Sequence, residues 1–453
     1  MYDLVVLGGG PGGQKAAELA SARGMKVALV EKDQLGGTCL NRGCIPTKAL
    51  YAHIIGGHGT REGLWDRVET VVNKLRQGTT TALRMAKVPV YRGHGTVTQW
   101  EGEKRITVGK ADGTTEDLTA ARLLIATGAR SVLPEFEGNR GAKIFTGDWA
   151  ITAPLLWDPR QNQDVKRVAV LGAGVIALEM AMMLQGLGKE VVLLKHSDQV
   201  LRRMDGDVKK AVVKALKGRK TVMRDYVTLI RAVESDGGLT LSGTEKDVPF
   251  EERCDALIVA SSMDPILDGF GLEGSSVAVR KGAIAVDEAM RTSVEGVYAI
   301  GDCTGGAMLA HLAEYQALAA VGDMTGDPYR VNMDALPSCI FIDPEVAVTG
   351  LTEEEAKSRG EEVVTAKAYF AANGMALALG QGDGFVKIVA RASDRRILGV
   401  HIMGPEAASL LGEATLAVAK GMTAEEVTRT VHAHPTLCEC FRDACARAAE
   451  AKA

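Results

Sequence analysis

Short apolar runs separated by helix-like stretches dominate the first two thirds of the chain. Runs of four residues without a polar side chain occupy positions 4–7, 27–30, 123–126, 168–171 and 191–194. Such short runs, bounded by glycine or charged residues, are typical of strands buried on both faces of a parallel sheet. The stretches 14–23 and 175–186, which follow two of these runs, have the length and composition of helices. The pattern therefore predicts repeated strand–helix–strand units and an α/β fold.

The pattern changes near residue 336. Segments 341–350, 384–389 and 397–402 are rich in β-branched residues, and segments 407–420 and 424–430 then have helical character. This order predicts an antiparallel sheet followed by two helices. We therefore expect a separate α+β domain at the C-terminal end of the sequence.

The first strand–helix–strand unit carries a G-x-G-x-x-G motif at Gly8, Gly10 and Gly13, and its second strand ends at Glu31. In this motif the first two glycines allow a tight turn and a close approach of the backbone to a pyrophosphate. The third glycine lets the helix pack against the strand. Glu31 can accept hydrogen bonds from a ribose hydroxyl, so the unit predicts one bound dinucleotide.

A second copy of the unit has Gly172, Gly174 and Ala177 at the motif positions. Lys195 lies 23 positions after Gly172, the same offset as that of Glu31 from Gly8, so a base replaces the acid. An acid here favours a free 2′-hydroxyl, whereas a cation accommodates a 2′-phosphate.

His196 and Arg202 follow closely in the sequence and add basic character. By this chemistry the second site favours NADP. NAD stays open, because a lysine at the end of a strand usually points into solvent.

Cys39 and Cys44 stand five positions apart among three glycines. Close cysteines in a large chain are more often catalytic, redox-active or metal-binding than structural. On a regular helix their Cα atoms would lie roughly 8–9 Å apart, too far for an unstrained disulfide, but Gly43 permits a closer approach. Two buried thiols or half of a zinc site are the alternatives. We expect no metal, because no second pair follows at the usual zinc-ligand spacing.

Glu179 lies on the predicted helix 175–186 among apolar neighbours three and four positions away. A carboxylate in these surroundings is expected to be buried and to need a partner. Lys48 is the candidate partner, and an exposed Glu179 is the alternative.

The composition is that of an ordinary globular protein of several domains, with 453 residues, 46% of them hydrophobic and 24% charged. The net charge of −4 gives no reason to expect nucleic acid or an anionic membrane as a partner. No apolar run reaches membrane length without interruption. Because a strand follows Met1 directly, we expect no targeting peptide and a cytoplasmic, reducing location, in which a Cys39–Cys44 bridge would cycle.

Residues 36–48, GGTCLNRGCIPTK, resemble the redox-disulfide segment of the FAD-dependent pyridine nucleotide-disulfide oxidoreductases. The resemblance covers essentially the full chain. It implies an α/β fold with two Rossmann-type dinucleotide-binding domains and a C-terminal α+β dimerisation domain. The implied parts are an FAD-binding domain with the redox disulfide (1–147), an NAD(P)-binding domain (148–265), a central domain completing the FAD site (266–334) and the interface domain of a homodimer (335–453).

The same resemblance assigns further cofactor contacts and a charge pair. It places Lys48 and Glu179 together beside the flavin N5. Its other FAD contacts are Thr127 and Gly128, in a segment ending in Ala-Thr-Gly, Asp302, in a second FAD fingerprint, and Met308, Leu309 and Ala310, at a helix start.

The tail segment 432–439, HAHPTLCE, resembles the part of the family that carries the catalytic base. The resemblance implies that His434 is the base and that Glu439 orients its imidazole ring. From its spacing, Glu439 is also suited to cap the following helix together with Thr436. We expect that one side chain cannot easily serve both roles. We interpret the remaining cysteines of the tail, Cys438, Cys440 and Cys445, as packing residues.

Within the family, the tail and the segment 307–314 (AMLAHLAE) favour the dihydrolipoamide dehydrogenases over the mercuric and glutathione reductases. This implies oxidation of dihydrolipoyl groups on a lipoyl carrier protein or lipoyl-dependent complex, through the disulfide and FAD, to NAD⁺ or NADP⁺. Two alternatives stay open: an NADPH-dependent reductase of a low-molecular disulfide, and a non-catalytic flavoprotein scaffold subunit.

Overall fold

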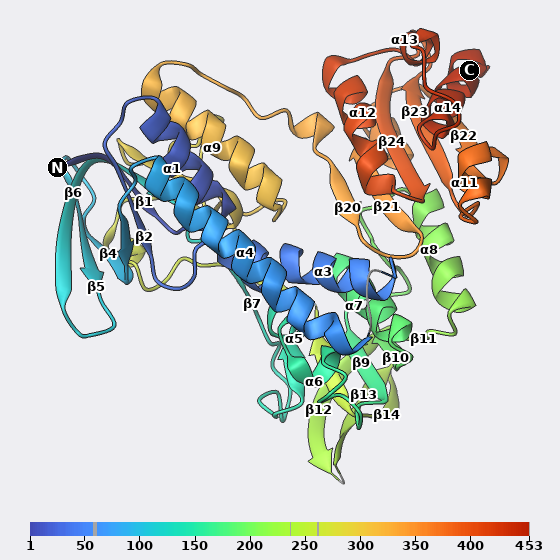
Figure 1. Cartoon of the computed structure of the whole chain (residues 1–453), viewed down its shortest axis with the longest axis horizontal. Coiled ribbons are helices and arrows are strands. Elements are labelled where there is room, and N and C mark those ends of the chain that lie inside the picture. Colours follow the sequence, from blue (N-terminus) through green and yellow to red (C-terminus); the bar gives the residue numbers. More distant parts are fainter. Residues whose placement is uncertain (58–60, 236, 261, 453) are drawn as a thin grey trace.

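The first sheet is organised around β1 (Tyr2–Leu7), which lies between two parallel neighbours and is buried over its last four residues. The computed structural model describes residues 1–57, 61–235, 237–260 and 262–452, and it orders this sheet β3-β2-β1-β6-β5-β4 (Figure 1). These strands are β2 (Val27–Glu31), β3 (Val90–Arg92), β4 (His94–Gln99), β5 (Lys104–Gly109) and β6 (Thr115–Ile125). β19 (Val297–Ala299) comes from far along the chain and pairs in parallel with β6.

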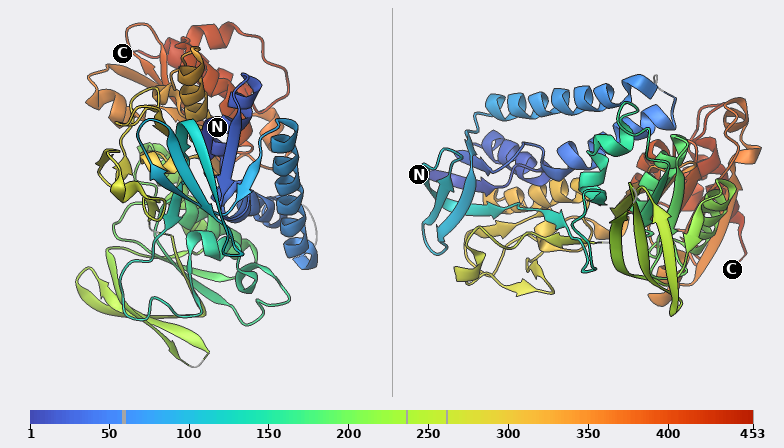
Figure 2. Two further views of the ribbon diagram at one scale, coloured as in Figure 1. Left: turned by 90° about the vertical axis from the view of Figure 1, so that its left-hand side faces the viewer. Right: turned by 90° about the horizontal axis from the view of Figure 1, so that it is seen from below.

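Helices from distant parts of the sequence pack beside this sheet. α1 (Pro11–Ala22) contacts α9 (Ala310–Thr325), and α4 (Leu64–Met85) contacts α1, α2, α3 and α6, so it runs from the first domain toward the second (Figure 2). α2 (Gly37–Arg42) and α3 (Cys44–Ile54) connect β2 to this helix layer. The late segment that contains β19 and α9 therefore belongs in space to the first domain.

The second sheet is parallel throughout, in the order β11-β10-β9-β15-β8. Its strands are β8 (Ile144–Thr146), β9 (Arg167–Leu171), β10 (Glu190–Leu194), β11 (Val222–Arg224) and β15 (Ala256–Val259). Its helices are α5 (Gly147–Ile151), α6 (Pro154–Trp157), α7 (Val175–Gly186) and α8 (Gly206–Gly218). A three-stranded antiparallel sheet of β12 (Val227–Ser235), β13 (Gly238–Glu245) and β14 (Val248–Cys254) is inserted before β15.

The third large sheet is antiparallel, in the order β20-β21-β24-β23-β22. Its strands are β20 (Ser338–Ile340), β21 (Glu345–Gly350), β22 (Val363–Tyr369), β23 (Phe385–Arg391) and β24 (Ile397–Gly404). The helices of this domain are α10 (Glu353–Ser358), α11 (Gly374–Ala378), α12 (Ala407–Lys420), α13 (Ala424–Arg429) and α14 (Glu439–Glu450).

Short elements complete the fold. They are the strands β7 (Ala129–Ser131), β16 (Met263–Pro265), β17 (Val279–Arg280) and β18 (Ala283–Ile284) and the 3₁₀ turns Arg61–Gly63, Leu272–Gly274, Gly301–Thr304, Met333–Ala335 and Phe370–Ala372. Among the residues that the structure describes, no helix combines the length and apolar character needed to span a membrane.

The predicted α/β fold is confirmed, and so are the five apolar runs as strands. The predicted helix 407–420 is found as α12 with the same limits. The predicted helix at 14–23 begins earlier, because Pro11 occupies the first helical turn, where its missing N–H needs no partner. The three boundaries between the four predicted domains stay predictions.

Alternate residues of β23 face two different cores, as expected for a strand with both faces covered. Val386 and Ile388 pack with the helices α12 and α14, whereas Phe385 packs into a cluster that also holds side chains of α3, α4, α7 and α8. The antiparallel sheet therefore rests with one face on its own helices and with the other on the second dinucleotide domain.

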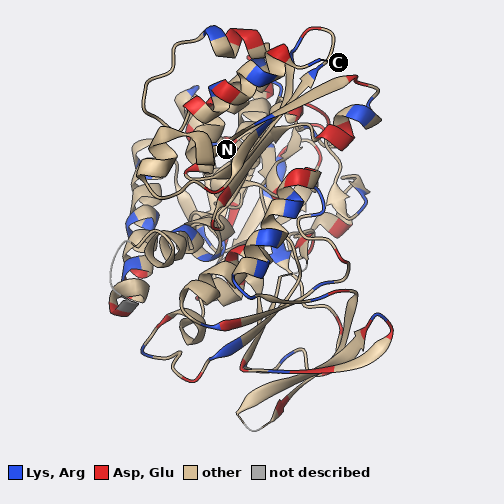
Figure 3. Ribbon diagram, turned by 90° about the vertical axis from the view of Figure 1, so that its right-hand side faces the viewer, with Lys and Arg blue, Asp and Glu red and all other residues tan. Residues whose placement is uncertain are grey.

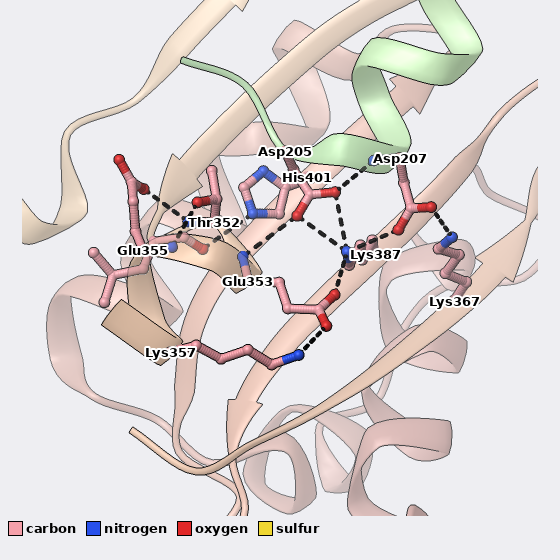
Figure 4. Close-up of polar contacts among 10 residues, drawn as sticks. Asp205, Asp207, Thr352, Glu353, Glu355, Lys357, Lys367, Lys387 and His401 are labelled. Carbon is pink, nitrogen blue, oxygen red and sulfur yellow. Dashed lines mark hydrogen bonds and ion pairs between the residues drawn. The ribbon is translucent and has the colours of Figure 1, made fainter. Parts of the chain in front are cut away.

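A buried ionic cluster crosses the same contact (Figure 4). The Lys387 ammonium on β23 lies 3.0 Å from both oxygens of Asp205, 2.8 Å from Asp207 Oδ2 and 2.9 Å from Glu353 Oε2. Lys367 pairs with Asp207, and Lys357 pairs with Glu353. Three carboxylates thus meet three ammonium groups, and the buried His401 ring lies beside them.

The protonation of this cluster predicts a pH-dependent stability. Burial works against the ionised carboxylates, but the ammonium groups lower the pKa of Asp207 to about 2 and also lower that of Glu353. The pKa of Asp205 is lowered by His401, by the Asp207 N–H and by Lys387. Unfolded carboxyls take up protons near pH 4, before the folded ones do. We therefore expect the free energy of unfolding to fall as pH drops from 5 toward 3. Urea titrations across this range measure the slope.

Lys387→Met raises the carboxyl pKa values in the folded state, so the slope should become smaller. The matched control is Lys110→Met, which removes a lysine from the exposed pair with Glu116 and should change the slope little. Equal slopes in the wild type and in Lys387→Met would contradict this account.

Candidate active site

The two close cysteines form a disulfide at the junction of α2 and α3. α2 ends at Gly43, whose backbone (φ −142°, ψ −111°) is neither helical nor extended, and α3 begins at Cys44. This break brings the Cα atoms of Cys39 and Cys44 to 4.7 Å, about half the separation on a regular helix. The prediction that Gly43 permits a bridge is confirmed. The alternatives of two free thiols and of half a zinc site are wrong.

The start of α2 lies against the first glycine turn. Gly37 has φ +57°, and a Cβ at this position would come within 2.8 Å of Gly10 Cα, so the two backbones are in direct contact. The Gly36 N–H donates to the Gly9 carbonyl oxygen at 2.8 Å. The disulfide is therefore held beside the turn that is predicted to bind a pyrophosphate.

Asn41, between the two cysteines, locks this segment and was missed by the sequence analysis. Its buried amide nitrogen donates to the carbonyl oxygens of Leu35 (3.0 Å) and Gly37 (2.8 Å). Its amide oxygen accepts two hydrogen bonds from Arg76 of α4. Its position between the two cysteines was the available signal, but Arg76 lies 35 positions away and no local pattern connects them.

The predicted pair of Lys48 and Glu179 is confirmed. Lys48 Nζ lies 3.1 Å from both carboxylate oxygens, and Glu179 is buried, so the alternative of an exposed glutamate is wrong. The Phe341 N–H donates to the same carboxylate at 2.9 Å, and its ring lies under the Lys48 ammonium at 4.3 Å. Burial raises the pKa of Glu179, while Lys48 and the Phe341 N–H act in the opposite direction.

The first dinucleotide turn has the geometry that its glycines predict. Gly8 has φ +112°, and a side chain there would collide with the Ala126 carbonyl; one at Gly13 would collide with Gly8. Glu31 ends β2, and its carboxylate accepts the N–H groups of Gly9 (2.6 Å) and Asp33 (2.7 Å). The predicted ribose contact of Glu31 stays a prediction, with the carboxylate already oriented toward the turn.

The second turn repeats this geometry with an open approach. Gly172 has φ +132°, and a Cβ there would lie 2.6 Å from the Ala260 carbonyl oxygen. Among the described residues, no atom outside the local backbone lies within 4 Å of a Cβ placed on Gly174, so this side of the turn leaves room for a ligand. Ala177 is fully buried, in the position where the first unit has its third glycine.

Lys195 turns inward instead of into solvent. Only 3% of the residue is exposed, and its ammonium lies 2.8 Å from Asp225 Oδ1 and 3.0 Å from the Asp198 carbonyl oxygen. The alternative of a lysine pointing into solvent is therefore wrong. His196 bonds through Nδ1 to the Val227 carbonyl oxygen at 3.1 Å, and Arg202 is exposed. The contacts predicted for Lys195, His196 and Arg202 with a 2′-phosphate stay predictions.

The tail forms a histidine–carboxylate pair before α14. His434 Nδ1 lies 3.1 Å from both oxygens of Glu439, and Glu439 Oε2 also accepts the Thr436 N–H at 2.9 Å. The predicted capping box is not formed, because Cys438 is the N-cap of α14 and no side chain caps it; Glu439 orients the ring and in addition accepts one backbone N–H. These bonds, that of Thr436 first, lower the pKa of Glu439.

Two of the three cysteines in the tail are packing residues, as predicted. Cys440 and Cys445 are buried against the antiparallel sheet, and burial raises the pKa of Cys440 to about 12. Cys438 is partly exposed, and its sulfur lies 3.0 Å from Thr436 Oγ1.

Residues 2–317 match the family model described as pyridine nucleotide-disulphide oxidoreductase, and residues 336–445 match the dimerisation domain of that family. The chain belongs to the pyridine nucleotide-disulphide oxidoreductases. A dihydrolipoyl dehydrogenase from Chlorobaculum parvum is 36% identical over all of this chain and 98% of its own length, and one from Bacillus subtilis is 35% identical with the same coverage. LpdA from Mycobacterium tuberculosis shares the fold, with a TM-score of 0.89 and 24% identity over 98% of this chain and 99% of its own.

Membership in this family makes the protein an FAD-dependent disulfide oxidoreductase, and the first domain fits that cofactor. Gly128 has φ +74° with open space around it, and Thr127 Oγ1 is held by the Ile266 carbonyl. Asp302 follows β19, and burial raises the pKa of its carboxyl, with no hydrogen-bond donor to it among the residues that the structure describes. A carboxylate in this position is suited to accept a hydroxyl hydrogen bond from the ribityl chain.

The N-terminus of α9 supplies the remaining predicted contacts. Leu309 is the N-cap of this helix and Ala310 its first residue, directly after Met308. The first N–H groups of a helix have no intrahelical partner and favour acceptors or negative charge. Contacts of these three residues with the flavin stay predictions.

His434 lies within the segment that matches the family's dimerisation domain, in a different domain from the disulfide. Its side chain is 78% exposed, in the tail of the third domain, whereas Cys39 and Cys44 lie in the first domain (Figure 1). That a second copy of the chain brings Nε2 of this ring to the disulfide stays a prediction.

Lys48→Met tests the buried charge pair. The Glu179 carboxylate loses its counter-charge, so its pKa rises further. We expect the free energy of unfolding at pH 8 to fall by about 1–3 kcal/mol, less than for a fully buried pair because Lys48 is one-third exposed. A carboxyl with a raised pKa destabilises the fold less as pH falls, so the deficit should shrink at pH 5.5 in urea titrations.

The control is the double variant Lys48→Met/Glu179→Gln, which carries no unpaired charge and should recover most of the loss. A deficit that is independent of pH and persists in the double variant would mean that Lys48 acts through packing alone.

Proposed function

We propose that the protein is a dihydrolipoyl dehydrogenase, which oxidises dihydrolipoyl groups of a lipoyl carrier protein and passes the electrons to NAD⁺. The observation that carries the proposal is the combination of a disulfide beside the first dinucleotide turn with a histidine whose ring is oriented by a buried carboxylate. The full-length likeness to proteins named dihydrolipoyl dehydrogenase supports the choice of substrate. The reducing cytoplasm is the expected location.

The reaction at the cysteines is a dithiol–disulfide exchange. Nε2 of His434 of the partner subunit accepts the proton of one substrate thiol, because the thiolate is the nucleophile. That thiolate attacks Cys39 Sγ and breaks the bond to Cys44, which leaves as a thiolate. The second substrate thiol attacks the substrate sulfur of the mixed disulfide and breaks its bond to Cys39 Sγ. Its proton passes to the released Cys39 sulfur, so the cyclic oxidised lipoyl group leaves and both cysteines are reduced.

Each other residue has a role in this exchange. Glu439 fixes the ring of His434 and stabilises it when it is protonated. Lys48, paired with Glu179, supplies a fixed positive charge on the helix that begins at Cys44. The first glycine turn, with Glu31 and Asp302, would hold FAD, which would supply the electron transfer that connects the reduced cysteines with the nicotinamide.

We infer NAD⁺ as the electron acceptor from the surroundings of Lys195. The Asp225 carboxylate already neutralises its ammonium, and the side chain is buried. A 2′-phosphate would have to compete with this carboxylate for the Lys195 ammonium. The presence of lysine in place of an acid at position 195 is therefore only weak support for NADP. Arg202, exposed in the following loop, is the residue left to favour the phosphate.

The first test is steady-state turnover with dihydrolipoamide, comparing kcat/KM for NAD⁺ and NADP⁺. We expect turnover with a clear preference for NAD⁺ and its complete loss in Cys44→Ser, because the exchange needs both sulfurs. Cys438→Ser is the matched control and should retain activity. NADPH-driven reduction of a small disulfide without lipoamide turnover would point to the reductase alternative, and unchanged behaviour of Cys44→Ser would point to a scaffold.

Asp225→Asn tests the role of the Lys195 pair. The freed ammonium should attract a 2′-phosphate and raise kcat/KM for NADP⁺ by about three- to tenfold, the size of an electrostatic interaction of ~1 kcal/mol at a partly exposed site. The value for NAD⁺ should change less. Adding Lys195→Met to this variant should remove the gain, and a gain that survives would assign discrimination to Arg202 instead.

A further inference from the structure

We propose that Lys387 is a positioning residue for the nicotinamide nucleotide, acting through Asp205. This inference rests on the proposed function and names a residue of the third domain that sets the geometry of the second dinucleotide site. The link is the segment 196–205, which runs from the end of β10 to the start of α8.

The segment 196–205 connects the second glycine turn to the ionic cluster over a short length of chain. At its middle, the Leu201 N–H donates to the carbonyl oxygen of Ala173, inside the glycine turn, at 2.9 Å. Leu201 has φ +46°, a left-handed conformation that a leucine adopts only when its surroundings impose it. Four residues later Asp205 enters the cluster. A shift of Asp205 is therefore transmitted to the turn through a single tight bend, closed by the Met204 N–H to the Leu201 carbonyl oxygen.

Asp205 is held from three sides and is fully buried. Its Oδ1 caps α8 by accepting the Asp207 N–H at 2.9 Å. The Lys387 ammonium, with 2% of the residue exposed, lies 3.0 Å from each carboxylate oxygen, and the Glu353 N–H approaches Oδ2 at 3.4 Å. Lys387 is the one ion-pair partner of Asp205 among the described residues, and its hydrogen bonds to the carboxylate are charge-assisted.

Apolar packing alone would not fix this geometry. Side chains of α8 and β23 share one hydrophobic cluster, and such contacts hold the domains together without choosing an orientation. A buried ion pair contributes little net stability compared with apolar groups of the same size, because both charges must leave water. Its hydrogen bonds are directional, so its effect here is to fix the register of α8 on β23.

The far end of α8 is fixed to the same domain. Arg219 forms an ion pair with Asp343, two residues after Phe341, whose N–H holds Glu179. Loss of Lys387 therefore releases only the nucleotide end of the helix. The disulfide, the Lys48–Glu179 pair and the His434–Glu439 pair have no contact with Lys387 among the described residues.

The charged and titratable groups around Lys387 come from four elements: α8, α10, β22 and β24. Asp205 and Asp207 lie on the N-terminal turn of α8, Glu353 on α10, Lys367 on β22 and His401 on β24, as Figure 4 shows. Figure 3 shows where charged residues lie along the ribbon. The lysines of α8 (Lys209, Lys210, Lys214 and Lys217) form no ion pair with the cluster among the described residues.

The experiment is Lys387→Met in the FAD-loaded protein. We expect the Kd for NAD⁺, measured by calorimetry, and the KM for NAD⁺ to rise about tenfold. The rate at which stoichiometric dihydrolipoamide bleaches the flavin absorbance, with no nucleotide present, should stay within twofold of wild type. The calorimetric arm does not depend on the substrate, so it reports on Lys387 even if dihydrolipoamide proves to be the wrong dithiol.

The matched control is Lys357→Met. This deletion removes the same charge from the same cluster, but Lys357 is 60% exposed and touches Glu353, not Asp205. It should leave the Kd for NAD⁺ unchanged, and an equal rise in both variants would overturn the proposal, because the effect would then belong to the net charge of the cluster.

The double variant Lys387→Met/Asp205→Asn separates positioning from lost stability. It removes the unpaired buried charge, so the midpoint of urea unfolding should recover while the Kd for NAD⁺ stays raised. A Kd that returns to the wild-type value together with stability would overturn the proposal, as would an unchanged Kd in Lys387→Met. If Lys387→Met does not fold, Asp205→Asn alone, which keeps the shape of the helix cap, must raise the Kd.

Discussion

The structure depends on one buried carboxylate, that of Glu179. It lies on α7, at the glycine turn of the second dinucleotide unit, and it cannot be charged in an apolar helix face without partners. Its partners come from two other domains: Lys48, on the helix that begins with Cys44, and the Phe341 N–H, next to the antiparallel sheet. Satisfying this single group therefore brings the disulfide helix, the second nucleotide unit and the third domain to one place.

The two kinds of force between the domains have different effects. The shared hydrophobic cluster of α3, α4, α7, α8 and the antiparallel sheet supplies most of the adhesion, since apolar burial is roughly proportional to area and has no direction. The ionic contacts add direction. Lys48 with Glu179 fixes the disulfide side of α7, and Lys387 with Asp205 fixes the start of α8, so that the two nucleotide sites keep one relative orientation.

The two glycine turns have the same geometry but different chemical surroundings, because an acid, Glu31, stands at the end of β2 and a base, Lys195, follows β10. Glu31 holds the backbone of its own turn, whereas Lys195 is drawn into a pair with Asp225 behind the strand. A comparison of the two motifs by offset alone treats these residues as equivalent. Their side chains point to different partners, because β10 has a neighbour, β11, whose end places Asp225 beside Lys195.

The sequence by itself determined the parts whose causes are local. Runs of apolar residues specified the strands, glycine spacing specified both turns, and Gly43 between two cysteines specified a break that lets them bond. Lys48 could be paired with Glu179 because a buried carboxylate must have a cation. Only the tertiary structure decided the rest: the bonds of Asn41 to Arg76, the double use of Glu439, the inward turn of Lys195 and the meeting of Lys387 with Asp205. Each of these contacts depends on which strand or helix lies next to another. The residues involved are up to 182 positions apart in the sequence, so no local pattern predicts that they meet.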